Sequence, residues 1–515
     1  KRQETAAMDS LGDFRPPPAE PPPPPDELLQ QLSSATLEEL RTSRLPLLFA
    51  AIDAATLDVS PQITSIVRRA FDGDEGLAAL RAPSTLPFLE RGVEHPDDLV
   101  RSYTIDQLRR LAATDLPHLR PVLPKIAAAI HDPALRVSES AAAFFAAVAD
   151  AGVGPLRLLL SDETVASLTQ TLRRAADPIA LRAANLLCAL ASKGEAQLGL
   201  CVELELLAPV LELWRQGDPL VRLNLIEIFG ALALSAAGFE WLRAGGIVAE
   251  LCRLVDWEAE EDAIVALQRP AALHCLGSLL EAGGDAAVDL LLKEEQIVSR
   301  LWPFLTAAAG EHSAALVLLR GAAASAVGAA QLLERGLDGL QPLPAMMRSH
   351  DERVRVGAFS VSAQLCATMV AHNSLELPAL VLTLQGLISS AAASASSSAA
   401  DTIAQVACSS FSEALRTSAL SLLLSLAQLH WGAAALCSSE STLELLLSSA
   451  ASFPVGPNEL RQKHAIAQLL VSMPVASTIL GADSGAMQSL RKYAQNGPFH
   501  PQRPRAAKAA APLTL

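Results

Sequence analysis

The sequence predicts an all-α fold, an α-solenoid of HEAT/armadillo-like helical repeats wound into a curved superhelix. Half of the residues are apolar but only 4% are aromatic. The apolar residues are mainly alanine and leucine, which favour helices over strands. A single core seldom grows to 515 residues, so a chain of this length forms several domains or one repeat array. A short motif that returns about every 40 residues favours the array.

The recurring motif is Asp-x-x-(Val/Leu)-Arg. Successive motif arginines between Arg101 and Arg222 lie 35, 46 and 40 residues apart, close to the period of HEAT and armadillo repeats. At this period the chain has room for about ten or eleven helix pairs. Complete copies of the motif occupy residues 97–101, 132–136, 218–222 and 351–355, and variants occupy 177–182 and 412–416.

Each motif position has a physical role. The aspartate can accept hydrogen bonds from the free N–H groups of a helix start, and proline beside it is preorganised for the first helical position. The apolar residue is expected to begin the buried stripe of the helix. The arginine can reach an aspartate of its own turn or of the neighbouring turn. These pairs would form a ladder along the stack.

Composition divides the chain into three parts. Residues 1–25 are expected to form a disordered proline-rich tail, in which residues 1–7, before Met8, are an expression remnant. The tract Arg15–Pro25 could be an SH3 or WW ligand, but a stiff, solvated tail is the favoured interpretation. Residues 26–498 are expected to form the solenoid, with a flexible Ala/Ser-rich loop near 388–402, and residues 499–515 a C-terminal tail.

Charge and cysteine usage exclude several function classes. A net charge of −15 argues against nucleic-acid binding, which depends on clustered lysine and arginine. The seven cysteines are scattered without C-x-x-C spacing, which indicates reduced, buried thiols. No secretory signal is visible, and no apolar run spans a bilayer without a charge or proline. We therefore expect no membrane partner and a location in the cytoplasm, with the nucleus as a second location.

Motifs for catalysis and cofactors are missing from the sequence. It has no phosphate-binding Gly-x-x-x-x-Gly-Lys-(Ser/Thr), no Gly-x-Ser-x-Gly and no His-Glu-x-x-His. His274 and Cys275 could be half of a metal site, but a core cysteine beside a half-buried histidine is the favoured interpretation. The acidic cluster 258–262 indicates a solvated loop or a contact for a basic partner. We expect no enzyme activity, no cofactor and no metal.

Candidate partner-binding residues come from the motif helices. In HEAT-like arrays the helix after the aspartate turn usually lines the concave face, so its polar positions could contact a protein. The alternative is that they are ordinary exposed residues, since many positions on such faces are energetically neutral. The candidates are Tyr103, Gln107, Arg110, Asn185, Asn224 and Glu227.

Three segments resemble the family of 26S proteasome non-ATPase regulatory subunit 5. They are Arg91–Arg101, Phe411–Arg416 with the leucine-rich helix that follows it to His430 and Trp431, and Tyr493–Phe499. The resemblance extends from about Leu28 to Pro504. The Ala/Leu-rich composition, the proline tail and the serine-rich loop depart from the family, which leaves the contact surface undefined.

This resemblance implies a chaperone for assembly of the base of the proteasome regulatory particle. Such a protein binds the C-terminal domain of an AAA ATPase subunit, in a precursor that also contains a neighbouring ATPase and a large non-ATPase scaffold subunit. It blocks premature docking on the core particle and leaves before the mature particle forms. On its own it is expected to be a monomer.

An armadillo-type scaffold or transport adaptor that binds extended peptides is the alternative. Armadillo importers carry repeated tryptophan and asparagine on their concave helices. The five tryptophans of this chain show no regular pairing with asparagine. The chaperone hypothesis is therefore preferred.

Overall fold

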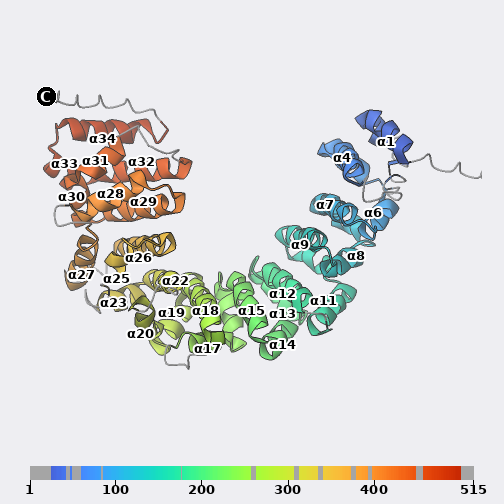
Figure 1. Ribbon diagram of the computed structural model, residues 1–515, viewed down its shortest axis with the longest axis horizontal. Helices are drawn as coiled ribbons and strands as arrows, with labels where there is room; N and C mark the ends of the chain where they lie inside the picture. The colour runs from blue at the N-terminus through green and yellow to red at the C-terminus, as the bar shows by residue number, and fades with distance from the viewer. Residues whose placement is uncertain are drawn as a thin grey trace, which may run out of the picture. The chain divides into compact units, whose positions relative to one another are not determined.

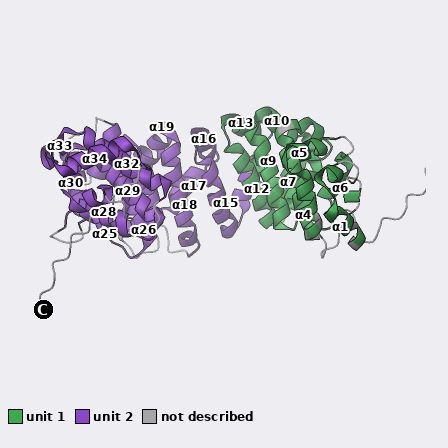
Figure 2. Cartoon of the chain, turned by 90° about the horizontal axis from the view of Figure 1, so that it is seen from above, with its two compact units in different colours: residues 1–209 green, residues 210–515 purple. Residues whose placement is uncertain are grey.

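The computed structural model describes residues 25–41, 44, 47–48, 51, 60–82, 85–174, 177–256, 263–306, 312–334, 340, 342–372, 378–392, 397–447 and 456–499. Throughout these residues every regular element is helical (Figure 1), which confirms the all-α solenoid prediction. The expected tails, except Pro25 and Phe499, and the acidic cluster 258–262 lie outside the described residues. The chain divides into two compact units, residues 1–209 and 210–515 (Figure 2).

The first unit is a stack in which each long motif helix packs on the next, α7 on α9 and α9 on α12. Shorter helices form a second row, as where α10 packs on α13. This unit contains α1 (Pro25–Ser34), α2 (Leu37–Arg41), α4 (Ser60–Phe71), α5 (Gly73–Leu80), α6 (Leu86–Val93), α7 (Asp98–Asp115), η1 (Leu116–Leu119), α8 (Leu123–Ala128), η2 (Ala129–His131), α9 (Leu135–Asp150), α10 (Val153–Leu159), α11 (Asp162–Arg174), α12 (Asp177–Ala191) and α13 (Glu195–Glu203).

The second unit has the same kind of arrangement within itself, with α15, α18, α22, α26, α29, α32 and α34 each packed on the next. Its first helices are α14 (Ala208–Gln216), α15 (Pro219–Leu232), α16 (Ala236–Ala244), α17 (Ile247–Leu254), α18 (Ala263–Ala282), α19 (Gly284–Val288), η3 (Asp289–Glu294), α20 (Ile297–Arg300), α21 (Trp302–Thr306) and α22 (His312–Ala323). They are followed by α23 (Ala326–Glu334), α25 (Pro342–Met346), α26 (Glu352–Ala371), α27 (Pro378–Ser389), α28 (Ala399–Ser409), α29 (Glu413–Ala427), α30 (His430–Ser438), α31 (Glu440–Leu447), α32 (Pro457–Ser472), α33 (Pro474–Leu480) and α34 (Gly485–Asn496).

The motif caps helices as predicted at most of its copies. Asp97 accepts from the Leu99 N–H, and Asp218 accepts from the Val221 N–H, both at 2.8 Å. The side chains of Asp351 and Ser412 cap α26 and α29 in the same way. A side-chain acceptor at this position satisfies one of the donors that a helix start leaves unpaired.

The copy at Asp132 departs from the prediction. Its carboxylate accepts from the Ala134 N–H at 2.9 Å, and α9 begins only at Leu135. Helix α9 therefore starts later after its motif aspartate than α7, which begins at Asp98, directly after Asp97. As a result Leu135 is 56% exposed, and Val137 is the first buried apolar residue of α9. The expectation that the motif apolar residue begins the buried stripe is wrong at this copy.

The expected loop near 388–402 is shorter in the structure. Helix α27 continues to Ser389, and α28 begins at Ala399. Ser398 and Asp401 form a capping box in which each side chain accepts from the backbone of the other. This cap starts a helix inside the Ala/Ser-rich stretch, where Ala399 and Ala400 are buried.

Two helices, α18 and α26, are long and apolar enough by length and composition to cross a bilayer, and three bent helix pairs pass the same test as single spans. In the second unit α18 packs between α15 and α22, and α26 packs between α22 and α29. A helix with neighbours on two sides is apolar on most of its faces. Packing inside the stack accounts for their apolar character.

Candidate functional site

The six candidate residues belong to both units, four to the first and two to the second. Helix α7 carries Tyr103, Gln107 and Arg110, and α12 carries the exposed Asn185. In the second unit, α15 carries Asn224 and Glu227. Each group is therefore described within its own unit.

The polar groups of α7 are largely engaged by the fold. The Arg110 guanidinium donates to the Phe71 carbonyl at 2.6 Å and to Gln107 Oε1 at 2.7 Å. A further bond of 3.3 Å reaches the Gly73 carbonyl, so Arg110 fixes the turn between α4 and α5. Gln107 is 7% exposed. The expectation that it presents a polar group at the surface is wrong, because Arg110 and the neighbouring helices cover it.

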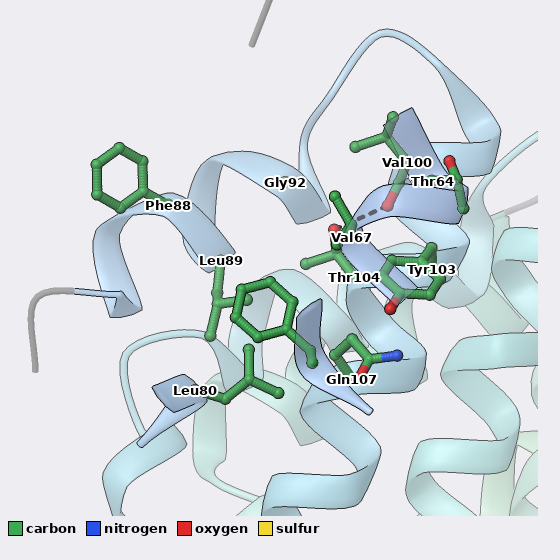
Figure 3. A pocket seen from close by; sticks show the side chains of 11 residues that line it. Thr64, Val67, Leu80, Phe88, Leu89, Gly92, Val100, Tyr103, Thr104 and Gln107 are labelled. Atoms are coloured by element: carbon green, nitrogen blue, oxygen red, sulfur yellow. Dashed lines mark hydrogen bonds between the residues drawn. The ribbon is translucent and has the colours of Figure 1, made fainter. Parts of the chain in front are cut away.

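Tyr103 lines an apolar pocket of the first unit (Figure 3). Its hydroxyl is buried and has no hydrogen-bond partner among the described residues, and burial raises its pKa. The Arg68 guanidinium lies 5.8 Å from the ring centroid. The pocket encloses about 20 Å³, room for one water molecule but not for a side chain of a partner. Thr64, Val67, Phe71, Leu80, Phe88, Leu89, Gly92, Val100, Thr104 and Gln107 complete the lining.

A larger groove lies in the second unit between α15 and α18. It encloses about 450 Å³, which is within the range of binding pockets. Most of its wall is apolar, and Glu227, His274 and Ser278 add polar groups. The lining consists of Leu223, Ile226, Glu227, Gly230, Leu267, Pro270, Ala271, His274, Cys275 and Ser278.

Helical spacing places these residues on facing sides of the two helices. On α15 the lining positions Leu223, Glu227 and Gly230 recur at intervals of three and four residues. The same intervals separate Leu267, Ala271, His274 and Ser278 on α18.

Two features hold the walls of the groove in place. The Gln268 amide donates to the Pro219 carbonyl at 2.7 Å, which joins α18 to the first turn of α15. Asp218 caps that turn. Pro270 lies inside α18, where it supplies apolar surface but no backbone donor.

The groove carries a negative charge. Glu227 is exposed, and no hydrogen bond or ion pair of its carboxylate is found in the part of the chain that the structure describes. The Asn224 amide, one turn earlier, donates to the Leu220 carbonyl at 2.8 Å. Partial desolvation of the imidazole and the nearby charge of Arg320 lower the pKa of His274, which favours the neutral imidazole. Arg320 itself pairs with Glu281 at 2.6 Å.

Sequence reasoning identified Glu227 but not the α18 side of the groove. His274 and Cys275 differ in their surroundings: His274 is exposed, whereas Cys275 is 3% exposed and burial raises its thiol pKa to about 12. Among the described residues no group of three or more His, Cys, Asp or Glu is placed to hold a metal ion. The run of Leu267, Ala271, His274 and Ser278 at helical spacing was the signal available in the sequence.

Comparison with known proteins identifies the family. A family model described as proteasome non-ATPase 26S subunit matches residues 29–282 and 384–514. The 26S proteasome non-ATPase regulatory subunit 5 of Mus musculus is 23% identical over 257 residues, which are 48% of this chain and 50% of the mouse protein. The Homo sapiens protein of the same name is 24% identical over the same shares. The match thus spans about half the length of these relatives.

The chain is also similar to two solved structures, at low sequence identity. A crystal structure of an engineered protein covers 81% of this chain and 99% of its own, with 14% identity and a TM-score of 0.43. A designed armadillo repeat protein in complex with a (KR)4 peptide covers 47% of this chain and 99% of its own, with 19% identity and a TM-score of 0.35. The family match extends over more than half of the sequence. The chain therefore belongs to the family of proteasome non-ATPase 26S subunits.

Proposed function

We propose that this protein is a chaperone for assembly of the base of the 26S proteasome regulatory particle. It binds the C-terminal domain of an AAA ATPase subunit and prevents premature docking of that subunit on the core particle. The observation that carries the proposal is the family match over both units, 29–282 and 384–514. The relatives are named as regulatory, non-ATPase subunits of the 26S proteasome.

The mechanism is steric and requires no chemistry by the chaperone. A stack of helices offers a long surface to one partner, and a bound stack occupies space that the core particle would otherwise fill. The groove between α15 and α18 adds an apolar anchor with a carboxylate at Glu227.

The large non-ATPase scaffold subunit is a second partner in the same precursor. The protein acts as a monomer without enzyme activity or cofactor, in the cytoplasm and nucleus.

Affinity purification of the full chain from native extract, followed by mass spectrometry, tests this proposal. The expected result is recovery of proteasomal ATPase subunits and the scaffold subunit with little assembled core particle. In a reconstituted assay, the full chain should bind the isolated C-terminal domain of one ATPase subunit. It should also slow association of the base with the core particle.

Two outcomes would contradict the proposal. One is a stoichiometric amount of the protein in mature proteasomes, since a chaperone leaves before completion. The other is tight capture of unrelated basic localisation peptides without any ATPase subunit, which would favour the armadillo-type adaptor instead.

A further inference from the structure

We infer that the groove between α15 and α18 binds an apolar segment of a partner protein that carries a lysine or arginine, and that this cation pairs with Glu227. The inference rests on the proposed function only for the identity of the protein that carries the segment. It deepens that function by naming the contact and its chemistry. The groove lies within the second unit, so the inference depends on no contact between the units.

The apolar surface extends beyond the groove itself. Leu220 is 59% exposed at the first turn of α15, next to the point where Gln268 of α18 bonds to Pro219. On α18, Leu267 is 52% exposed and Ile264, one turn earlier, is 43% exposed. Single exposed leucines are common on protein surfaces. Leu220 and Ile264 differ because they continue the lining, which includes Leu267, at the same helical spacing where α15 and α18 adjoin.

The charge of the groove selects the class of segment. On docking, an apolar segment would remove water from Glu227, and an unpaired carboxylate loses its hydration at a large cost. A lysine or arginine on the segment offsets this cost through a charge-assisted hydrogen bond. The groove lining contains no lysine or arginine that could do so from within the chain, and the nearby Arg320 is already paired with Glu281.

The same charge argues against other occupants. A nucleic acid or an acidic segment would bring negative charge to Glu227 and to a chain with a net charge of −15. The volume of about 450 Å³ accommodates a few side chains rather than a domain. The groove therefore acts as an anchor point within a larger interface, where a few residues supply most of the binding energy.

Fluorescence anisotropy of the full chain with labelled short peptides tests the inference. The probe is a leucine-rich peptide with one central lysine, and its matched control has glutamate in place of that lysine. We expect saturable binding of the lysine peptide and at least about tenfold weaker binding of the glutamate peptide. Glu227→Lys should weaken binding of the lysine peptide about tenfold and strengthen binding of the glutamate peptide.

Matched variants separate this effect from general changes of surface charge or apolarity. Glu294→Lys changes an exposed carboxylate of the same unit outside the groove and should leave both affinities unchanged. Leu267→Asp should abolish binding of the lysine peptide, whereas Leu382→Asp, at a leucine that is 66% exposed on α27, should not. Circular dichroism of every variant checks that the helices remain folded.

Several outcomes would overturn the inference. They are equal binding of both peptides, an unchanged affinity in Glu227→Lys, or no saturable binding at millimolar peptide. A wild-type dimer that Leu267→Asp converts to a monomer would assign the groove to a second copy of the chain instead. The proposed function is judged separately: if Glu227→Lys still captures ATPase subunits like the wild type, the groove assignment fails while the chaperone role stands. If the wild type captures none, the chaperone role fails and the peptide experiment still decides the groove.

Discussion

Arg101 and Asp132 form a two-pronged ion pair between successive repeats. Arg101 Nε donates to Asp132 Oδ2 at 2.8 Å, and Nη2 donates to Oδ1 at 2.9 Å. The remaining guanidinium nitrogen donates to the carbonyls of His95 and Pro96, at 2.7 and 2.8 Å. One arginine thus closes its own capping turn and holds the turn of the next repeat. Its planar guanidinium suits both tasks.

The arrangement recurs near the C-terminus. Arg416 Nε donates to Glu459 at 2.8 Å, and its Nη1 donates to the carbonyls of Ser410 and Phe411. The contacts of the other motif arginines vary. Arg136 pairs with Asp98 of the preceding repeat at 3.2 Å, and Arg182 donates to the Asp132 carbonyl at 3.1 Å. Arg222 and Arg355 instead donate to carbonyls just before their own motif, those of Arg215 and Met347, at 3.1 and 3.3 Å. The predicted ladder is therefore present at some repeats and interrupted at others.

Loss of the Arg101–Asp132 pair should destabilise the first unit. The two side chains are 15% and 11% exposed. Asp132→Ala therefore leaves the Arg101 cation largely buried and should lower the free energy of unfolding of the first unit by about 3 kcal/mol. The five tryptophans all lie beyond residue 209, so hydrogen exchange of α7 and α9 is the suitable measurement. Arg157→Ala is the control, because its pair with Glu203 is exposed on both sides. Unchanged protection in Asp132→Ala would refute the expectation.

Asp401 should confer an acid-sensitive contact between α28 and α31. Burial alone would raise its pKa, but hydrogen bonds from Ser398, Ser439 and Ser441 outweigh this and lower the pKa to about 2. A pKa below the unfolded value means that the ionised form stabilises the fold. The contribution is complete above about pH 4 and is lost as the pH falls toward 2.

Comparison of Asp401→Asn with the wild type measures this contribution. The variant should lose about 1 kcal/mol at neutral pH, as expected for a weakened helix cap. The difference between the two proteins should shrink as urea unfolding is repeated at pH values from 5 down to 2.5. A difference that stays constant with pH would show that the charge of Asp401 does not contribute.

Thiol labelling should separate Cys408 from the other cysteines. Six of the seven cysteines are buried and Cys408 is exposed. Burial raises the pKa of the thiols of Cys201, Cys252 and Cys366 to about 12, which suppresses the reactive thiolate. An aromatic disulfide reagent at pH 8 should therefore label one thiol in the native protein and seven in denaturant. Cys408→Ser should abolish the native signal; rapid labelling of several thiols would contradict the packing described.

Gly321 should tolerate no side chain. A Cβ at Gly321 would overlap the carbonyl oxygen of Gly277, and a Cβ at Gly277 would lie 2.9 Å from the Val317 carbonyl oxygen. Helices α18 and α22 thus cross at a pair of glycines. Gly321→Ala should destabilise the second unit by about 2 kcal/mol in urea unfolding followed by tryptophan fluorescence.

Gly230→Ala provides the matched control for this close approach. Gly230 lies in α15 of the same unit, and nothing lies within 4 Å of the position that its Cβ would occupy. Alanine there should stabilise the helix by about 0.5–1 kcal/mol, because it restricts the unfolded chain. If both alanine variants behaved alike, the crossing of α18 and α22 would be looser than described.

The fold class and the repeat can be predicted from the amino-acid sequence alone. Local chemistry is sufficient for both: alanine and leucine favour helices, and Asp97, Asp218 and Asp351 bond to backbone groups two or three residues away. The same local logic identified Glu227 as a polar residue on a helix with an otherwise apolar pattern. It could not show that Gln107, which has a similar pattern, is covered by Arg110 and the turn after α4.

Local sequence does not show which motif arginines reach a neighbouring repeat or which residues share a surface. These relationships depend on where α9 begins relative to α7, or on how α18 packs on α15. A shift of the helix start by two residues exposed Leu135 and buried Val137, although the motif itself is intact. The groove brings Glu227 of α15 next to Leu267 and His274 of α18, which lie 40 and 47 positions further along the chain. Their proximity arises from side-chain packing that no local pattern specifies.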